Sequence, residues 1–270
     1  MKYGHWVEEQ TRQTHELRTA LQAHVSDIEL NILVDNGLNH YYDLFRMKAT
    51  AAKADVFYLM SGMWKTSAER FFFWIGGFRP SELLKGMDDN HSCEGCGHKF
   101  VRSKESTVQI GTLRVLFRIQ ACLTLCSPEL RQPFELLSAL CSLQVLMPQL
   151  DPLTEQQLVE ICNLQQCSQQ AEDALSQGLD KLQQTLADTL ASDASNAGSY
   201  MTQMAEAMDR LEALVSFVNQ ADHLRQQALQ QLSRILTVRQ VARGLLALGD
   251  YFQRLRALSS LWAARPREPT

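Results

Sequence analysis

The sequence lacks any apolar run that approaches the roughly 20 residues needed by a membrane-spanning helix. Its first residues, MKYGHWVEEQTRQ, are polar and contain no apolar segment of the signal-peptide kind. Both absences predict an intracellular protein that makes no contact with a membrane. In that compartment its seven cysteines are expected to be reduced thiols.

Basic charge is also scarce. The formal net charge is −4, whereas a domain that holds nucleic acid by bulk electrostatics is expected to be basic. A helix that reads the DNA major groove needs a dense run of Lys and Arg. The first 25 residues contain only Lys2, Arg12 and Arg18 as basic side chains. The sequence therefore predicts that this stretch does not read DNA.

Enzyme motifs are missing as well. The pair Gly76-Gly77 is not followed by the Lys-Ser/Thr that would contact phosphate and metal. No nucleophile elbow and no carboxylate pair at a useful helical spacing stands out. The sequence predicts a protein that is not an enzyme and needs no cofactor. A helical enzyme without recognisable motifs is the alternative, and measurable turnover would be needed to support it.

Strand-like alternation of apolar and polar residues is absent, and apolar residues instead recur every three or four positions. Capping boxes, in which a Ser or Thr is followed three residues later by Glu or Gln, begin at Ser26, Thr66, Thr154 and Thr237. Long helices are expected from about 5 to 25, from Thr154 to Leu190, from Met201 to Leu236 and from Thr237 to Trp262, with a flexible linker at 193–199. The helix after Ser26 is expected to present Ile32, Leu33, Leu38, Tyr42 and Phe45. The predicted fold class is all-α, a bundle of long antiparallel helices.

One stretch, residues 39–84, is far richer in large apolar side chains than the rest. It holds two of the four Trp, three of the six Tyr and six of the eleven Phe, so it is either a core or a partner surface. Within it, Phe71 to Ile75 are expected to form a short, fully buried helix that Gly76-Gly77 ends. Pro80 then opens the next helix near its first position.

This block also carries a family resemblance. The runs FRMK (45–48), AAKADVFYLMSGMWKTSAERFFFWIGGFRPSELL (51–84) and NLQQCSQQAEDALSQGLDKLQQTLADTLAS (163–192) resemble the C-terminal half of plant TGA-type bZIP transcription factors, a region called the DOG1 domain. The match covers about residues 1–85 and 145–268. The residues taken as family signature and core are Tyr42, Phe45, Trp64, Phe72, Trp74, Gly76, Gly77 and Trp262.

The resemblance implies nuclear proteins that recognise TGACG-type elements as homo- or heterodimers. It also implies recruitment of salicylate-responsive ankyrin-repeat coactivators and of glutaredoxins. The family reads DNA through a bZIP region just upstream of the resembling part, and that basic region is not found here. A regulatory, dimerising and coactivator-binding domain is therefore the expected function.

The family comparison also divides the chain. Residues 1–25 correspond to the tail of the zipper-side helix, and 26–85 with 145–268 to one discontinuous helical domain. Between them, residues 86–144 are 59 extra residues that contain no Trp or Tyr and five of the seven Cys. We interpret this segment as an insertion of low order, translated from a retained intron or introduced by a gene-model error.

A metal site is the functional alternative for the insertion. Cys93 and Cys96, followed by His98, could join Cys122 and Cys126 in a tetrahedral zinc site, which would make the protein a thiol or zinc switch. The second pair lies in an apolar run that resembles a buried helix. Chance cysteines are a sufficient explanation if the segment was never selected, and that reading is preferred.

Two further sets of residues have alternative interpretations. Cys162 and Cys167 are redox candidates by resemblance to some TGA factors, but their spacing of five residues, about 500° of rotation, puts them on different helix faces. A structural Cys162 and an incidental Cys167 is the preferred reading. Met201, Met204 and Met208 could form an adaptable partner surface, although core filling at helical spacing is the preferred expectation.

Overall fold

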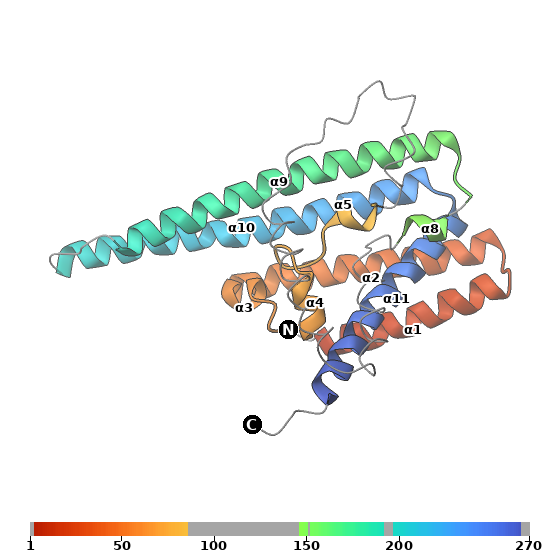
Figure 1. Ribbon diagram of the computed structural model, residues 1–270, viewed down its shortest axis with the longest axis horizontal. Coiled ribbons are helices and arrows are strands. Elements are labelled where there is room, and N and C mark those ends of the chain that lie inside the picture. The colour runs from red at the N-terminus through yellow and green to blue at the C-terminus, as the bar shows by residue number, and fades with distance from the viewer. Residues whose placement is uncertain (1–2, 86–145, 151, 192–196, 266–270) are drawn as a thin grey trace, which may run out of the picture. The chain divides into compact units, whose positions relative to one another are not determined.

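The computed structural model describes residues 3–85, 146–150, 152–191 and 197–265. These residues form helices, and among them the only β-type pairing is an isolated bridge between Trp74 and Gly77. The helices are α1 (Tyr3–Gln22), α2 (Asp27–Ala54), α3 (Val56–Met60), α4 (Ser67–Phe71), α5 (Pro80–Leu83), α8 (Met147–Leu150), α9 (Glu155–Ala191), α10 (Ala197–Ile235) and α11 (Val238–Ala264), as Figure 1 shows. The predicted all-α class is confirmed.

The helix starts follow the local capping chemistry. The amide of Ser26 donates to the Glu29 carboxylate at 3.2 Å, and the amide of Glu29 donates back to the Ser26 hydroxyl at 3.3 Å. Equivalent reciprocal bonds join Thr154 to Gln157 and Thr237 to Gln240. The partners are three residues apart, so these starts depend on local sequence alone and were predicted correctly.

Two packing arrangements organise the described helices. Helices α9 and α10 lie side by side as a long hairpin, and α1, α2 and α11 pack against one another (Figure 1). Helix α2 also packs on α10 and so joins the two groups, while the short α4 and α5 lie against α11 and α9. The far ends of α9 and α10 run beyond the other helices (Figure 1). No helix among the described residues is long and apolar enough to cross a membrane.

The expected buried face of α2 is partly wrong. Ile32 is 58% exposed, whereas Leu30, Val34 and Leu38 lie in the core. The buried stripe continues through Tyr41 and Phe45, and Ile32 lies on the face of α2 opposite to that stripe. Apolar residues at helical spacing occur on more than one face of α2, and only the neighbouring helices decide which of these faces is buried.

The expected helix at Phe71–Ile75 is also wrong. Helix α4 ends at Phe71, which is 45% exposed. A two-residue hairpin follows, in which Trp74 and Gly77 exchange amide-to-carbonyl hydrogen bonds of 2.8 and 2.9 Å. Ile75 and Gly76 both have positive φ, 33° and 75°, as a type I′ turn requires. The reason for this turn is a buried cation, described below.

Two expectations about connections have different outcomes. Helix α10 begins at Ala197, so the predicted linker at 193–199 extends too far into the helix, and 192–196 lie outside the described residues. Pro80 is the first residue of α5, as predicted. The insertion at 86–144, with its proposed zinc ligands, lies outside the described residues, and both ideas stay predictions.

Candidate functional site

The described helices bury a cation, Arg225 of α10, whose side chain is completely buried. Its guanidinium donates to the carbonyl oxygens of Phe78 at 2.7 Å and of Ile75 at 3.0 Å, and also to that of Trp74. The type I′ turn carries the Trp74 and Ile75 carbonyls, and Phe78 directly follows it, so one reversal of the chain brings all three oxygens to the guanidinium. Three backbone carbonyl oxygens thus accept hydrogen bonds from Arg225.

A second buried cation shares the same counter-ion. Asp222, one helical turn before Arg225, accepts from the Arg225 guanidinium at 2.6 Å and from the ammonium of Lys48 on α2. Two cations and one carboxylate therefore lie out of water together. Burial lowers the pKa of Lys48 to about 7, since desolvation disfavours the charged ammonium more than Asp222 stabilises it. Burial lowers the pKa of Arg225 as well.

A second cluster surrounds Lys65, in the turn before α4. Its ammonium lies over three aromatic rings, 4.9 Å from the centroid of Tyr3, 4.8 Å from Trp64 and 5.3 Å from Phe252. It also donates to the Tyr3 hydroxyl at 3.0 Å and lies 3.5 Å from the Glu69 carboxylate. Burial lowers the pKa of Lys65 to about 8, and Glu69 offsets part of this effect.

Glu69 has a double role in this cluster. As the capping residue of α4, it accepts from the Thr66 amide at 3.0 Å and from the Thr66 hydroxyl at 2.8 Å. Its other oxygen accepts from Tyr3 at 2.8 Å. Burial alone would raise the pKa of the Glu69 carboxyl, but Lys65 and the Thr66 bonds together lower it. The cap therefore also anchors the N-terminal helix α1.

A third buried carboxylate joins α9 to α5. Glu172 is fully buried and accepts from the Ser81 amide at 2.8 Å and from the Ser81 hydroxyl at 2.6 Å. Burial raises the pKa of Glu172, and the two Ser81 bonds oppose that rise. Because Ser81 is near the start of α5, this carboxylate satisfies an amide that the helix cannot.

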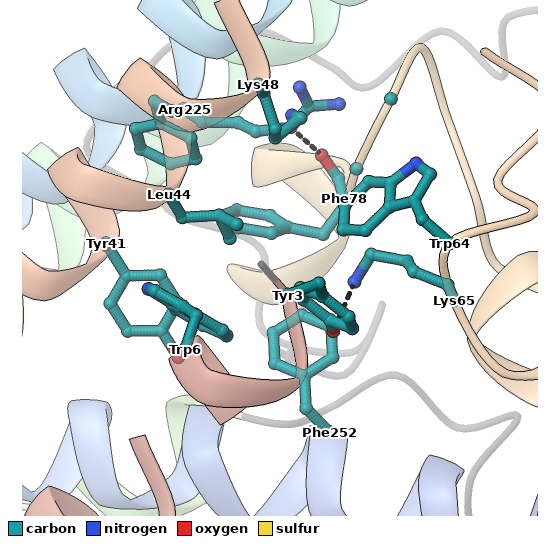
Figure 2. Close-up of a pocket in the computed structure, with 13 residues that line it drawn as sticks. Tyr3, Trp6, Tyr41, Leu44, Lys48, Trp64, Lys65, Phe78, Arg225 and Phe252 are labelled. Atoms are coloured by element: carbon teal, nitrogen blue, oxygen red, sulfur yellow. Dashed lines mark hydrogen bonds between the residues drawn. The ribbon is translucent and has the colours of Figure 1, made fainter. Parts of the chain in front are cut away.

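A small cavity of about 20 Å³ lies between the first two clusters. Figure 2 shows Lys48 and Arg225 on one side of it and Lys65 with Tyr3 on another, with the ring of Phe78 between them. A cavity of this volume holds about one water molecule. The residues around it can therefore fix the packing of α1, α2, α10 and α11, but they do not form a preformed pocket for an organic ligand.

The signature residues fall into different environments. Phe45 and Trp64 are buried, and Gly76 and Gly77 form the turn that cradles Arg225. Tyr42, Phe72 and Trp74 are partly buried. Trp262 is 50% exposed near the end of α11, so the expectation that it lies in the core is wrong, because no described helix covers that end. Their assignment as a family signature remains a prediction.

The two redox candidates are separated on α9. Cys162 is half-buried and Cys167 is exposed, and they are not joined by a disulfide. Within the described ranges, no group of three or more His, Cys, Asp or Glu side chains is arranged to hold a metal ion. A redox role for these cysteines stays a prediction.

The sequence interpretation missed Lys48, Asp222, Arg225 and Glu172. A signal was present for two of them. Asp222 and Arg225 follow Val218 and precede Leu229 at spacings of three and four, on the apolar stripe of α10. A charged pair in phase with buried apolar residues indicates a buried ion pair.

In the described residues, buried charges hold the helices of the bundle together. The family described as "DOG1: Seed dormancy control" matches residues 13–87. Transcription factor TGA4 of Arabidopsis thaliana is 57% identical over 270 residues, and these cover 100% of this chain and 58% of the relative. Transcription factor TGA1 of the same plant is 55% identical over 270 residues, covering 100% of this chain and 57% of the relative.

A third relative is the TGACG-sequence-specific DNA-binding protein TGA-1A of Nicotiana tabacum, which is 54% identical over 271 residues, covering 100% of this chain and 59% of the relative. These relatives are transcription factors rather than enzymes. The chain is similar along its whole length to TGA transcription factors. It spans less than two thirds of the length of these relatives.

Proposed function

We propose that this chain is the regulatory, dimerising and coactivator-binding region of a plant transcription factor that acts at TGACG-type elements in the nucleus. The observation that carries the proposal is the identity of 54–57% to TGA factors along the whole chain, including a relative named for TGACG-specific DNA binding. The family resemblance implies that the chain acts in the regulation of salicylate-dependent defence or of development.

The residues of this chain suit a role through partners rather than through DNA. Its first 25 residues contain three basic side chains, too few for a helix that reads the major groove. The partners are TGA-type factors as homo- or heterodimers, together with ankyrin-repeat coactivators and glutaredoxins. The described helices offer exposed apolar side chains to such partners, among them Met201, Met208 and Trp262.

A gel-shift titration tests the proposal. Full-length TGA4 is bound to a labelled TGACG element, and the purified chain is added in increasing amounts. If the chain enters mixed dimers that have one DNA-reading helix instead of two, the shifted band weakens as the chain is added. Heat-denatured chain is the control and is expected to leave the band unchanged. An unchanged band across the titration with native chain contradicts the proposal.

A pull-down tests the coactivator part separately. Immobilised chain is expected to retain an ankyrin-repeat coactivator of the family from a solution of purified components. Failure to retain it, while the gel shift responds, would remove coactivator binding from the proposal and leave dimerisation in place.

A further inference from the structure

Helix α10 exposes a stripe of apolar side chains. Met201 and Met208 are 68% and 62% exposed, seven residues apart on the same face, with Glu212 four residues further along that face. A different face of α10 is buried at Ala207 and Leu214. The core-filling expectation is therefore wrong for Met201 and Met208, because the side of α10 that packs inward is not theirs. Exposed methionines adapt readily to a partner.

The same part of the α9–α10 hairpin is acidic. Residues 173–191 and 197–216 contain six Asp and Glu and two Lys and Arg. Of the two cations, Arg210 lies 3.9 Å from Glu206 of its own helix. We call the exposed set the hairpin surface, and its members are Leu190, Tyr200, Met201, Met208, Asp209 and Glu212.

A second exposed apolar set lies on α3, in the turn between α3 and α4, on α4 and at the end of α11. The amide of Ala68 donates to the Ser259 hydroxyl at 2.8 Å and so holds α4 against α11. We call this set the aromatic end, and its members are Phe57, Tyr58, Met63, Phe71, Leu261 and Trp262. Aromatic residues, Met and Arg are the side chains enriched in protein–protein interfaces. Large apolar groups left exposed together indicate an interaction surface.

The aromatic end is basic. Inside the molecule, Glu69 forms ion pairs with Lys65 and with Arg256. Residues 53–71 and 253–265 contain further charges that are accessible to solvent. The cations are Lys53, Arg70, Arg254 and Arg265, and the single acid is Asp55. Arg254 and Leu261 lie on one face of α11. Arg265 directly follows the helix, and its guanidinium lies 3.6 Å from the centroid of the Trp262 ring, so cationic and apolar groups lie together at this end.

We propose that the hairpin surface of one copy of this chain docks on the aromatic end of a second copy, and that the two contacts are exchanged reciprocally in a two-fold dimer. Each contact brings an acidic apolar surface against a basic apolar one. The apolar side chains become buried, and the charges select the pairing and its orientation.

The alternatives between copies are electrostatically unfavourable. Pairing hairpin surface with hairpin surface would bring two sets of acidic side chains together, and pairing two aromatic ends would do the same for cations. A single unreciprocated contact would leave both surfaces open at the ends and would add copies without limit. The reciprocal dimer covers all four surfaces. This dimer specifies how the dimerisation in the proposed function takes place, and the inference therefore rests on the proposed function.

A charge-swap experiment tests the docking on the full chain. The first variant carries Asp209→Arg and Glu212→Arg, and the second carries Arg254→Glu and Arg265→Glu. Molar mass is measured by light scattering after size-exclusion chromatography. The wild-type chain is expected to be a dimer and each variant alone a monomer. An equimolar mixture of the two variants is expected to restore the dimer, because the reversed hairpin of one matches the reversed end of the other.

The outcomes are separable. A dimer in either variant alone, or a mixture that stays monomeric while circular dichroism shows both variants folded, overturns the proposal. A wild-type chain that is monomeric at tens of micromolar also overturns it. A dimer that persists in both variants while the gel-shift titration succeeds would place dimerisation elsewhere and leave the proposed function standing.

A second arm tests the apolar contribution without changing charge. Met201→Gln with Met208→Gln is expected to raise the dimer dissociation constant at least tenfold. Ile28→Gln with Ile32→Gln is the matched control, because these α2 side chains are also exposed but belong to neither surface. An equal effect of both pairs contradicts a specific contact at the hairpin surface.

Discussion

The guanidinium of Arg225 occupies the space in which a side chain on Gly77 would begin. A Cβ atom on Gly77 would lie 2.9 Å from both Cζ and Nε of Arg225, closer than carbon and nitrogen atoms pack. The turn can approach the buried cation only because residue 77 has no side chain. Gly77 is therefore needed for this close approach, whereas Gly76 is needed for its φ of 75°.

Gly77→Ala is expected to destabilise the chain by about 3 kcal/mol, because it displaces a buried charge from the carbonyls that satisfy it. Urea denaturation followed by circular dichroism measures the free energy of unfolding. Gly4→Ala is the control, since Gly4 is exposed on α1 and a Cβ atom there would have no neighbour within 4 Å. Equal stability of the two variants would show that Arg225 can move without loss.

Stability is expected to rise with pH between about 7 and 10. The pKa of Lys48 is about 7 and that of Lys65 about 8 in the folded chain, against 10.5 for an ordinary lysine. In this window the unfolded state binds more protons than the folded state, so the free energy of unfolding increases with pH. The slope reaches about 1.4 kcal/mol per pH unit for each lysine. Above about pH 10 the trend reverses, because burial raises the pKa of Tyr3 and Tyr41.

Lys48→Met isolates the contribution of one lysine to this pH dependence. The rise in melting temperature from pH 7.5 to 9.5 is expected to become smaller in this variant. Lys53→Met, which replaces an exposed lysine on the same helix, should leave the rise unchanged. The same slope in wild type and Lys48→Met would mean that Lys48 keeps an ordinary pKa.

Glu172→Ala is expected to cost about 2–3 kcal/mol, since it leaves the buried Ser81 amide without an acceptor. Glu172→Gln retains one carbonyl oxygen for that amide and is expected to cost about 1 kcal/mol. Asp180→Ala, which replaces an exposed acid on the same helix, serves as the control and should be close to neutral. If Ala and Gln at position 172 destabilise equally, the hydrogen bonds to Ser81 are not what holds α5 to α9.

The two described thiols are expected to react at different rates. Cys167 is exposed and Cys162 half-buried, so a thiol reagent such as a maleimide should label Cys167 first under native conditions. Mass spectrometry of peptides after short labelling times gives the order, and the Cys167→Ser variant should lose the fast phase. Mild oxidation that joins Cys162 to Cys167 would contradict the geometry, which places the two thiols on different faces of α9.

The insertion prediction is tested by peptide mass spectrometry of the protein from its native source. If residues 86–144 come from a retained intron, peptides are expected that join Leu84-Lys85 directly to Val145-Leu146. Peptides from residues 100–144 as the main species would contradict this interpretation. Metal analysis of Cys93, Cys96, Cys122 and Cys126 would then be the next measurement.

Sequence alone determined the elements that depend on near neighbours. Capping boxes at Ser26, Thr154 and Thr237 were found correctly, because each joins residues three positions apart. The all-α class followed from apolar spacing in the same way. The resemblance to TGA factors also came from sequence, because it rests on long runs of specific residues, and the similarity to the relatives confirms it.

Tertiary structure decided which residues are buried and which turn is strained. Arg225 reaches the Phe78 carbonyl across 147 residues, and Lys48 reaches Asp222 across 174. No local pattern contains those partners, and a charge is stable in a core only when its partner is there too. The same reason explains the turn at 74–77, whose carbonyl groups bind Arg225. Met201 and Met208 are exposed because another face of α10 packs inward, and Trp262 is exposed because no described helix covers the end of α11.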